Sequence, residues 1–486
     1  MTNAEENPLI ALRCEKMEKL RAMNVPPFGN SFLGTESTAS LFKNFEAERK
    51  VRFAGRVMTH RDMGKSHFMH LQDQFGKIQI YIQPKNLTEE ETETFKLIDL
   101  GDWIGVDGSL FETKTGEKSI RVEKLTFLTK AMRPLPDKWH GLSDTEARYR
   151  QRYLDLATNE ESRRVFLLRS RILSEMRRFL ESRGFMEVET PMMQTVPGGA
   201  AARPFLTHHN ALDIDIYMRI APELYLKRLL VGGFEKIFEV NRNFRNEGIS
   251  RKHNPEFTML EAYWAYANFE MFADLVEAMV CHLAENIIGT LTIARPASPD
   301  GTPQTPINLQ QPWKRRRYHD CIRDAAGADW FELTPEKRKV RAQELGVEIS
   351  PAMVDFEVTQ QIFEKLVEAK TVDPLYVTHL PKELVPLARQ NVENPNLVDV
   401  YELIINGQEI SPGYTELNDP LVQRERLEHQ AGEEIQKIDE DFLLALEHGM
   451  PPAGGIGLGV DRLIMLLTST ESIRDVILFP LLKPKV

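Results

Sequence analysis

The stretch FEVNRNFRNEGISRKHNPEFTMLEAY, residues 238–263, is the most informative segment of this chain. Polar and apolar residues alternate on both sides of a basic loop at residues 248–255, which indicates two antiparallel strands joined by that loop. With a period of two, each strand gathers polar or functional side chains on one face. These residues are Glu239, Asn241, Asn243, Arg245 and Glu247 on the first strand and Phe257, Met259, Glu261 and Tyr263 on the second.

Two interpretations of this hairpin are open. A charged strand face commonly lies in solvent, and each charged residue taken alone fits that interpretation. Together, however, the four residues named below favour a nucleotide site, because an arginine neutralises phosphate, a ring stacks on a base and carboxylates hold an amine. They are Arg245, Glu247, Phe257 and Glu261.

The segments FRNEG and HNPEFTMLEAY closely resemble motif 2 of the class II aminoacyl-tRNA synthetases, in the form found in the lysine-specific family. GFMEVETPMM, which contains Pro191, is similar to motif 1, and GIGLGVDRLIM, which contains Arg462, is similar to motif 3. The three motifs come in the family's order. The resemblance implies an α+β protein with an N-terminal OB-fold β-barrel and a class II synthetase catalytic domain, built on an antiparallel β-sheet flanked by helices.

Length and composition are ordinary for a soluble globular protein. The 486 residues allow two or three domains. A net charge of −11 gives no support for a nucleic-acid partner but does not exclude one, since recognition needs only a local basic surface. The separated cysteines Cys14, Cys281 and Cys321 predict reduced thiols in a cytoplasmic protein. No signal peptide and no membrane-spanning segment are expected.

Changes in pattern along the chain predict its domains. Residues 1–48 are expected to form a helical segment, 49–133 an OB-fold anticodon-binding domain, 134–147 a linker, and 148–486 the catalytic domain. The barrel is predicted from five short alternating strands separated by Gly-rich or polar turns. A less regular stretch at 296–394, with two expected helices, occupies the position of a variable insertion in the family.

The predicted barrel either serves only for packing or binds a nucleic-acid strand through an aromatic and polar face. The resemblance implies that Phe68 stacks on the central anticodon base, while Gln79 and Glu117 read the edge of that base. Arg61 is a further expected contact with tRNA. Barrel geometry alone leaves Phe68 equally compatible with the core.

A long amphipathic helix ending at Arg183, followed by a strand to Pro191, carries the motif 1 resemblance. Such a helix usually only packs against a core. The resemblance implies that this helix and strand form the interface of a homodimer.

The dipeptide Asn406-Gly407 is the strongest short hairpin signal in the chain. A two-residue turn there pairs Ile404 with Glu409 and makes Glu402 a diagonal neighbour of Glu409, at about 7–8 Å. The two carboxylates are either solvent-exposed or bind magnesium beside a triphosphate. The resemblance implies metal binding by Glu402 and Glu409, with about three Mg²⁺ ions per active site when ATP is bound.

The resemblance also implies an acidic pocket for L-lysine. Two ammonium groups need carboxylate partners, because an unpaired buried charge is costly. Glu223 and Glu261 are expected around the amino-acid headgroup, and Glu416 with Tyr263 at the ε-ammonium group. The full expected lysine-binding set is Gly199, Glu223, Arg245, Glu261, Tyr263, Glu409, Tyr414 and Glu416.

The implied reaction is that of a lysine–tRNA ligase. The lysine carboxylate attacks the α-phosphorus of ATP, giving lysyl-adenylate and pyrophosphate, and lysine then passes to the 3′-terminal adenosine of tRNA(Lys). Arg245 and Arg462 are the expected catalytic residues, since they would stabilise the growing negative charge. The expected ATP-binding residues are Arg245, Glu247, His253, Phe257, Glu402 and Arg462.

Three other functions are consistent with parts of the sequence. A relative that lysylates a protein typically lacks the barrel, and an aspartate or asparagine enzyme would need other groups than Glu261 and Glu416. A regulatory RNA-binding paralogue would not need the intact arginines.

One departure from the family is Ser411-Pro412, where Gly-Asn is common. Proline cannot supply the hydrogen bonds of an asparagine side chain.

Overall fold

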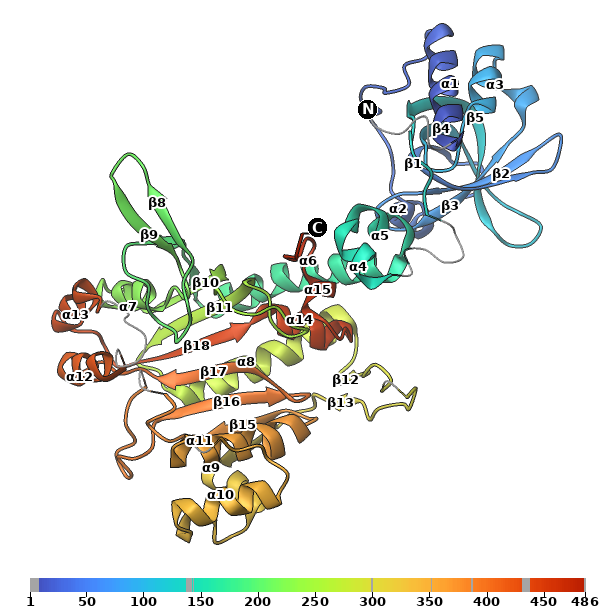
Figure 1. Cartoon of the computed structure of the whole chain (residues 1–486). Helices are drawn as coiled ribbons and strands as arrows, with labels where there is room; N and C mark the ends of the chain where they lie inside the picture. The colour runs from blue at the N-terminus through green and yellow to red at the C-terminus, as the bar shows by residue number, and fades with distance from the viewer. Residues whose placement is uncertain are drawn as a thin grey trace. The chain divides into compact units, whose positions relative to one another are not determined.

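The computed structural model describes residues 8–136, 142, 144–298, 300–350, 352–385, 388–430 and 438–484. The chain divides into two compact units, Met1–Ser143 and Asp144–Val486. Both are drawn in Figure 1. Within these residues, no helix has the length and apolar character that crossing a membrane requires.

The first unit contains a closed barrel whose described strands follow the order β1-β2-β3-β5-β4. Neighbouring strands are antiparallel except β3 and β5, which are parallel. Inward residues such as Phe53, Ile80 and Leu110 are fully buried. The expected OB-fold barrel is therefore confirmed. Its strands are β1 Lys50–Asp62, β2 His67–Gln72, β3 Lys77–Ile82, β4 Trp103–Glu112 and β5 Lys118–Thr129; its helices are α1 Pro8–Ala22, α2 Thr38–Lys43, η1 Pro84–Asn86 and α3 Glu89–Lys96.

The second unit is built on a large sheet, whose described strands follow the order β14-β15-β16-β17-β18-β11-β10-β6. The pairs from β15 to β10 are antiparallel, and the outermost pairs β14–β15 and β10–β6 are parallel. The expected antiparallel sheet flanked by helices is confirmed, with parallel strands added at its edges. The sheet strands are β6 Met186–Glu187, β10 Lys236–Phe244, β11 Glu256–Ala265, β14 Lys314–Arg317, β15 Leu375–Thr378, β16 Val400–Ile405, β17 Gln408–Thr415 and β18 Ala453–Gly459.

Helices cover this sheet, and two smaller sheets, β12-β13 and β7-β9-β8, accompany it (Figure 1). The helices are α4 Thr145–Arg150, α5 Arg152–Thr158, α6 Glu160–Glu181, α7 Glu223–Val231, α8 Phe269–Leu283, η2 Ala284–Ile288, α9 Tyr318–Ala326, η3 Trp330–Glu332, α10 Pro335–Glu344, α11 Asp355–Ile362, η4 Phe363–Val367, η5 Glu368–Lys370, α12 Pro420–Gln430, α13 Glu440–Glu447, α14 Val460–Thr468 and α15 Ile473–Val476. The short strands are β7 Met193–Gln194, β8 Leu206–His209, β9 Ile214–Met218, β12 Thr292–Ile293 and β13 Ile307–Asn308.

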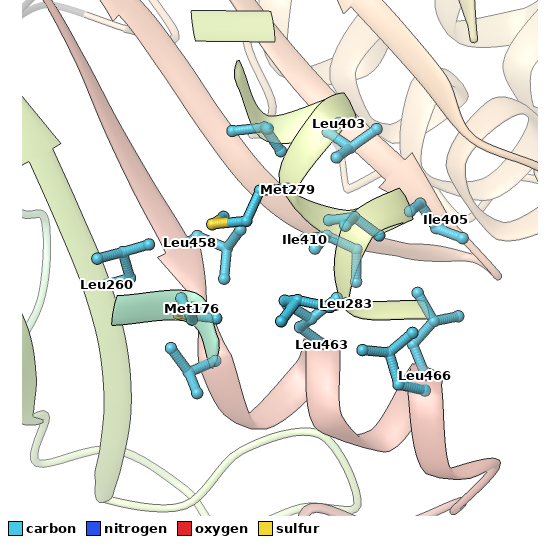
Figure 2. Packing of buried hydrophobic residues seen from close by; sticks show 14 of the residues in the cluster. Met176, Leu260, Met279, Leu283, Leu403, Ile405, Ile410, Leu458, Leu463 and Leu466 are labelled. Carbon is cyan, nitrogen blue, oxygen red and sulfur yellow. The ribbon is translucent and has the colours of Figure 1, made fainter. Parts of the chain in front are cut away.

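The main core of this unit lies where α6, α8 and α14 pack on one face of the sheet (Figure 2). Met279 and Leu283 of α8 meet Leu458 of β18 and Leu463 of α14. The residues between motifs 2 and 3 add α9, α10 and α11, which share a second buried cluster with β15 and β16. These packed layers hold β11, β17 and β18 rigidly, and those strands carry most of the side chains considered below.

We expect Leu403→Ala to lower the free energy of unfolding of the second unit by about 2–5 kcal/mol, because it leaves a cavity in this core. Leu403 is fully buried. The measurement is urea denaturation of both proteins. The matched control is Leu444→Ala on α13, where the side chain is 53% exposed and the change should be small. Equal effects of the two substitutions would contradict the assignment of Leu403 to the core.

Candidate active site

A cavity of about 360 Å³ lies where β11, β17 and β18 meet the start of α7, the loop after β10 and the start of α14. It gathers every residue expected to bind lysine or ATP except Glu402, which lies on β16 and is not among the lining residues. Segments far apart in the sequence therefore converge on one site. The expected residues that line it are Gly199, Glu223, Arg245, Glu247, His253, Phe257, Glu261, Tyr263, Glu409, Tyr414, Glu416 and Arg462.

The β10–β11 hairpin has the expected antiparallel form, but its first strand is shorter than expected. Arg245 and Glu247 are expected on that strand from the alternation of the sequence, whereas β10 ends at Phe244. Arg245 still donates its backbone N–H to the Pro255 carbonyl at 2.8 Å. The N–H of Asn246 then turns to the Arg203 carbonyl at 2.7 Å, which draws the backbone away from the ladder. Glu247 consequently lies in an exposed loop.

One end of the cavity is acidic, and a fully buried lysine that sequence reasoning did not identify contacts two of its carboxylates. Glu223, the first residue of α7, and Glu416 are both buried. The Nζ atom of Lys227 lies 2.6 Å from Oε1 of Glu223 and 2.6 Å from Oε2 of Glu416. Lys227 follows Glu223 by four residues in a helix, a spacing that brings opposite charges together and could have signalled the pair.

Burial and neighbouring charges raise the pKa values of two side chains at this acidic end. The pKa of Glu261 is raised well above its usual range by burial and by Glu223 and Glu239, against the opposing effect of Arg245. The pKa of Tyr263 is likewise raised, by burial and by nearby carboxylates. The Tyr263 hydroxyl donates to Oε2 of Glu261 at 3.4 Å. Both side chains thus face the same confined acidic space.

Two glycines make room for the carboxylates. Gly199 has a φ of +86°, a conformation that side chains rarely adopt, and a Cβ atom there would lie 2.9 Å from the Glu223 Cβ. A Cβ atom on Gly455 of β18 would lie 2.0 Å from Oε1 of Glu416 and 2.7 Å from Cε1 of Tyr263. The glycine-rich β18 therefore lets the Glu416 carboxylate lie directly against its backbone.

The other end of the cavity is cationic. The Arg245 guanidinium carbon lies 5.1 Å from the centre of the Phe257 ring, and its buried Nε atom has no hydrogen-bond partner among the described residues. Arg462 donates to the backbone carbonyl of Glu409 at 2.8 Å and lies 3.3 Å from Nε2 of His253. Two guanidinium groups beside an aromatic ring form a suitable environment for a nucleotide phosphate.

Asp461, which sequence reasoning did not single out, fixes the start of α14. Its carboxylate accepts the Thr258 backbone N–H at 2.7 Å and an Arg169 N–H at 2.6 Å. These bonds join α14 to β11 and α6, so that the following residue, Arg462, is held at the cavity. Its adjacency to Arg462 was the available signal.

Glu402 and Glu409 lie on paired strands, although their register differs from the expected one. Ile404 pairs with Glu409 as expected, but an irregularity follows, and Glu402 faces Pro412. Burial, Glu409 and then Glu368 raise the pKa of Glu402 well above its usual range. Glu368 comes from the insertion, where the sequence carries no motif, and its carboxylate accepts the Glu409 backbone N–H at 3.3 Å.

This cluster offers carboxylate oxygens suited to Mg²⁺. Across the described ranges, no three His, Cys, Asp or Glu side chains form a complete metal site. Mg²⁺ is usually held by one or two carboxylates together with substrate phosphates and water. Glu402 and Glu409 therefore fit a cation whose remaining ligands come from a bound nucleotide.

On the barrel, Phe68 is half-buried and stands outside the core. Its ring centre lies 5.0 Å from that of Tyr81, and Arg61 is its cross-strand partner. Gln79 is buried and donates to Ser119 Oγ at 2.8 Å, while the exposed Glu117 carboxylate lies 2.9 Å from Nε2 of His70. The four expected residues lie on contiguous barrel strands or the turn beside them.

Comparisons with known proteins agree with this architecture. Residues 144–483 match the family of class II tRNA synthetases (D, K and N), and residues 51–128 match the OB-fold nucleic acid binding domain. The chain is 50% identical to a lysine–tRNA ligase of Carboxydothermus hydrogenoformans, with all of both chains covered. It is 49% identical to that of Pelotomaculum thermopropionicum, covering 99% of this chain and 96% of the relative. For that of Bacillus anthracis the identity is 47%, over 100% and 99% of the two chains.

The family match covers nearly all of the second unit, and the first of these relatives matches from end to end. The chain therefore belongs to the class II aminoacyl-tRNA synthetases of the D, K and N group, in the lysine–tRNA ligase family.

Proposed function

We propose that the cavity of this lysine–tRNA ligase binds L-lysine at its acidic end and ATP at its cationic end. The single observation that supports this is the convergence of Glu223, Glu261 and Glu416 with Arg245 and Arg462 on one cavity. Lysine carries two ammonium groups and one carboxylate, so it requires acids around its amines. Its carboxylate would then point toward Arg245 and the nucleotide.

In the proposed reaction, the lysine carboxylate attacks the α-phosphorus of ATP, and pyrophosphate leaves. Arg245 would hold both the carboxylate and the α-phosphate, and Arg462 would neutralise charge that develops on the phosphate chain. Phe257 would stack on adenine, with Glu247 and His253 orienting the nucleotide. Mg²⁺ bound through Glu402 and Glu409, with about three ions per site, would supply charge neutralisation at the phosphates. Glu409 and Tyr414 would border lysine as well.

Arg462→Ala should reduce lysine-dependent ATP–pyrophosphate exchange by about 10²–10³-fold, because a preorganised donor to the transition-state charge is removed. The measurement is exchange at saturating lysine and ATP, with thermal denaturation to verify folding. Arg323→Ala is the control, since Arg323 is an exposed arginine of α9 paired only with Asp320 among its salt bridges. Undiminished exchange in a folded Arg462→Ala protein would refute the role.

We propose that the first unit binds the tRNA(Lys) anticodon, with Phe68 stacking on the central base and Gln79, Glu117 and Arg61 contacting the loop. The half-exposed ring of Phe68 beside Tyr81 supports stacking. Gln79 is buried, so its proposed contact requires the base edge to approach the barrel wall closely. We accordingly assign residues 49–133 to anticodon binding and 148–486 to catalysis.

Phe68→Ala should weaken tRNA charging by about 1–3 kcal/mol in apparent tRNA affinity, because one base loses its stacking partner. Lysine-dependent exchange needs no tRNA and should stay unchanged. Phe75→Ala provides the control, since Phe75 is a 55% exposed aromatic in a neighbouring barrel turn. Equal losses in exchange and charging would argue against an anticodon role for Phe68.

We also propose a homodimer formed through α6, β6 and the segment that follows. β6 is an edge strand of the sheet, and edge strands with exposed apolar residues commonly pair or become covered. Met186, Met192 and Met193 are 42%, 46% and 59% exposed. We further place the enzyme in the cytoplasm, which its three free cysteines support.

Light scattering should give twice the chain mass of 55.9 kDa. Met193→Asp should raise the dimer dissociation constant at least tenfold, because it places a charge in an apolar contact. Val340→Asp, at a 55% exposed position on α10, should leave the mass unchanged. A monomeric parent protein would exclude the proposed dimer.

A further inference from the structure

Lys227 is the most completely buried charged group at the acidic end of the cavity. Its side chain has no exposed surface, and its Nζ atom lies 2.6 Å from a carboxylate oxygen of each of Glu223 and Glu416. The two acids come from α7 and from the residue after β17, so the lysine joins elements distant in the sequence. The proposed reaction assigns no task to this ammonium group.

The charges at this end come close to balance only when Lys227 is counted. Glu223 and Glu416 provide two carboxylates at this end and Lys227 provides one ammonium group. Burial raises the pKa of Glu261, and Arg245 lies at the cationic end beside Phe257. The remaining single negative charge equals in size the net positive charge of L-lysine. Without Lys227 the excess negative charge doubles. Buried carboxylates respond to excess negative charge by taking up a proton.

The groups that surround Glu416 make this carboxylate the one that takes up the proton. It faces Lys227 and Glu223 of α7, Tyr263 of β11 and Tyr414 of β17, while β18 presents glycine backbone at Gly455. Burial raises the pKa of Glu416 to about 7, with Lys227 opposing the rise and Glu223 adding to it. Lys227 is the cation that acts on it most strongly, and its own pKa is raised by Glu223 and Glu416 despite burial.

Geometry also shows that Lys227 orients both acids. It binds one oxygen of each carboxylate, Oε1 of Glu223 and Oε2 of Glu416. The second oxygen of Glu416 lies against Gly455, and that of Glu223 lies 3.6 Å from the position of a Cβ atom on Gly199. Both residues line the cavity, which leaves these second oxygens as the ones available to a ligand.

We propose that Lys227 is a positioning and specificity residue for L-lysine, an internal counter-ion that fixes the direction of the Glu223 and Glu416 carboxylates and favours the ionised form of Glu416. The inference rests on the lysine site proposed above. Lys227 acts through the two carboxylates and does not touch the reacting atoms. Its presence selects an amino acid with one net positive charge, because a neutral or anionic amino acid would leave the pocket unbalanced.

The test is the pH dependence of kcat/KM for lysine in ATP–pyrophosphate exchange, measured between pH 6 and 8.5 for the parent protein, Lys227→Met and Lys227→Gln. A carboxylate binds an ammonium group only when ionised, so the parent value should fall as the pH drops through about 7. Removing the Lys227 ammonium group raises the pKa of Glu416 further. The fall in kcat/KM for lysine should therefore begin at a higher pH in both variants. At pH 7 we expect at least a tenfold rise in KM for lysine, with KM for ATP nearly unchanged.

Lys130→Met is the matched control. Lys130 is also fully buried and bridges Asp99 and Asp102 at 2.7 Å each, but in the barrel unit. Its loss removes a similar ion network and should leave the lysine KM and the pH profile of exchange unaltered. A shift in Lys130→Met equal to that in Lys227→Met would overturn the inference.

Three results separate this inference from the proposed function. A parent protein without lysine-dependent exchange would refute the lysine site itself. Exchange in the parent together with an unchanged KM for lysine at pH 7 in a folded Lys227→Gln protein would overturn the role of Lys227 alone. A folded Lys227→Met or Lys227→Gln protein whose pH profile and KM for lysine equal those of the parent would also overturn the inference.

Discussion

The structure depends on compensating several acidic side chains that the fold buries together. Glu223, Glu261 and Glu416 reach the cavity from α7, β11 and the residue after β17, and all three are buried. Removing a carboxylate from water costs several kcal/mol unless a cation or hydrogen bonds offset the loss. Lys227 and Arg245 provide part of that compensation from within the protein. The proposed substrate provides the rest, so the same imbalance that weakens the unliganded site favours binding of lysine.

The sheet makes this concentration of charge possible. β11 pairs with β10 on one side and with β18 on the other, so that Glu261 faces Glu239 and Gly457. One side of these strands packs against α6, α8 and α14 (Figure 2), and the other borders the cavity. Burial of Leu260 and Leu458 thus fixes the direction in which their neighbours Glu261 and Gly457 point. In a strand the period of two converts apolar packing on one face into positioning on the other.

Much of this arrangement could be predicted from the sequence, because its signals are local. The alternation of polar and apolar residues predicts the barrel strands and both hairpins. The dipeptide Asn406-Gly407 predicts the pairing of Ile404 with Glu409. The remainder depended on contacts between distant segments. The end of β10 follows from a bond between Asn246 and Arg203, and Glu368 reaches Glu409 from an insertion without any motif. The role of Lys227 cannot be predicted from a local pattern, because its second partner, Glu416, lies almost 200 residues further along the chain.

Pro412 shows how a departure from the family can be accommodated by the strand it occupies. Proline has no N–H to donate and is tolerated in sheets mainly at edges and bulges. Pro412 pairs with Glu402 close to the register shift in β16 and β17, where the ladder is already irregular. It lines the cavity, and its Cγ atom and the Met259 Cε atom lie 3.9 and 3.0 Å from where a Cβ atom of Gly457 would stand. The wall is therefore apolar at this point. Discrimination of the proposed lysine substrate must then come from the carboxylates and their internal counter-ion, which read charge, and not from a side-chain amide at position 412.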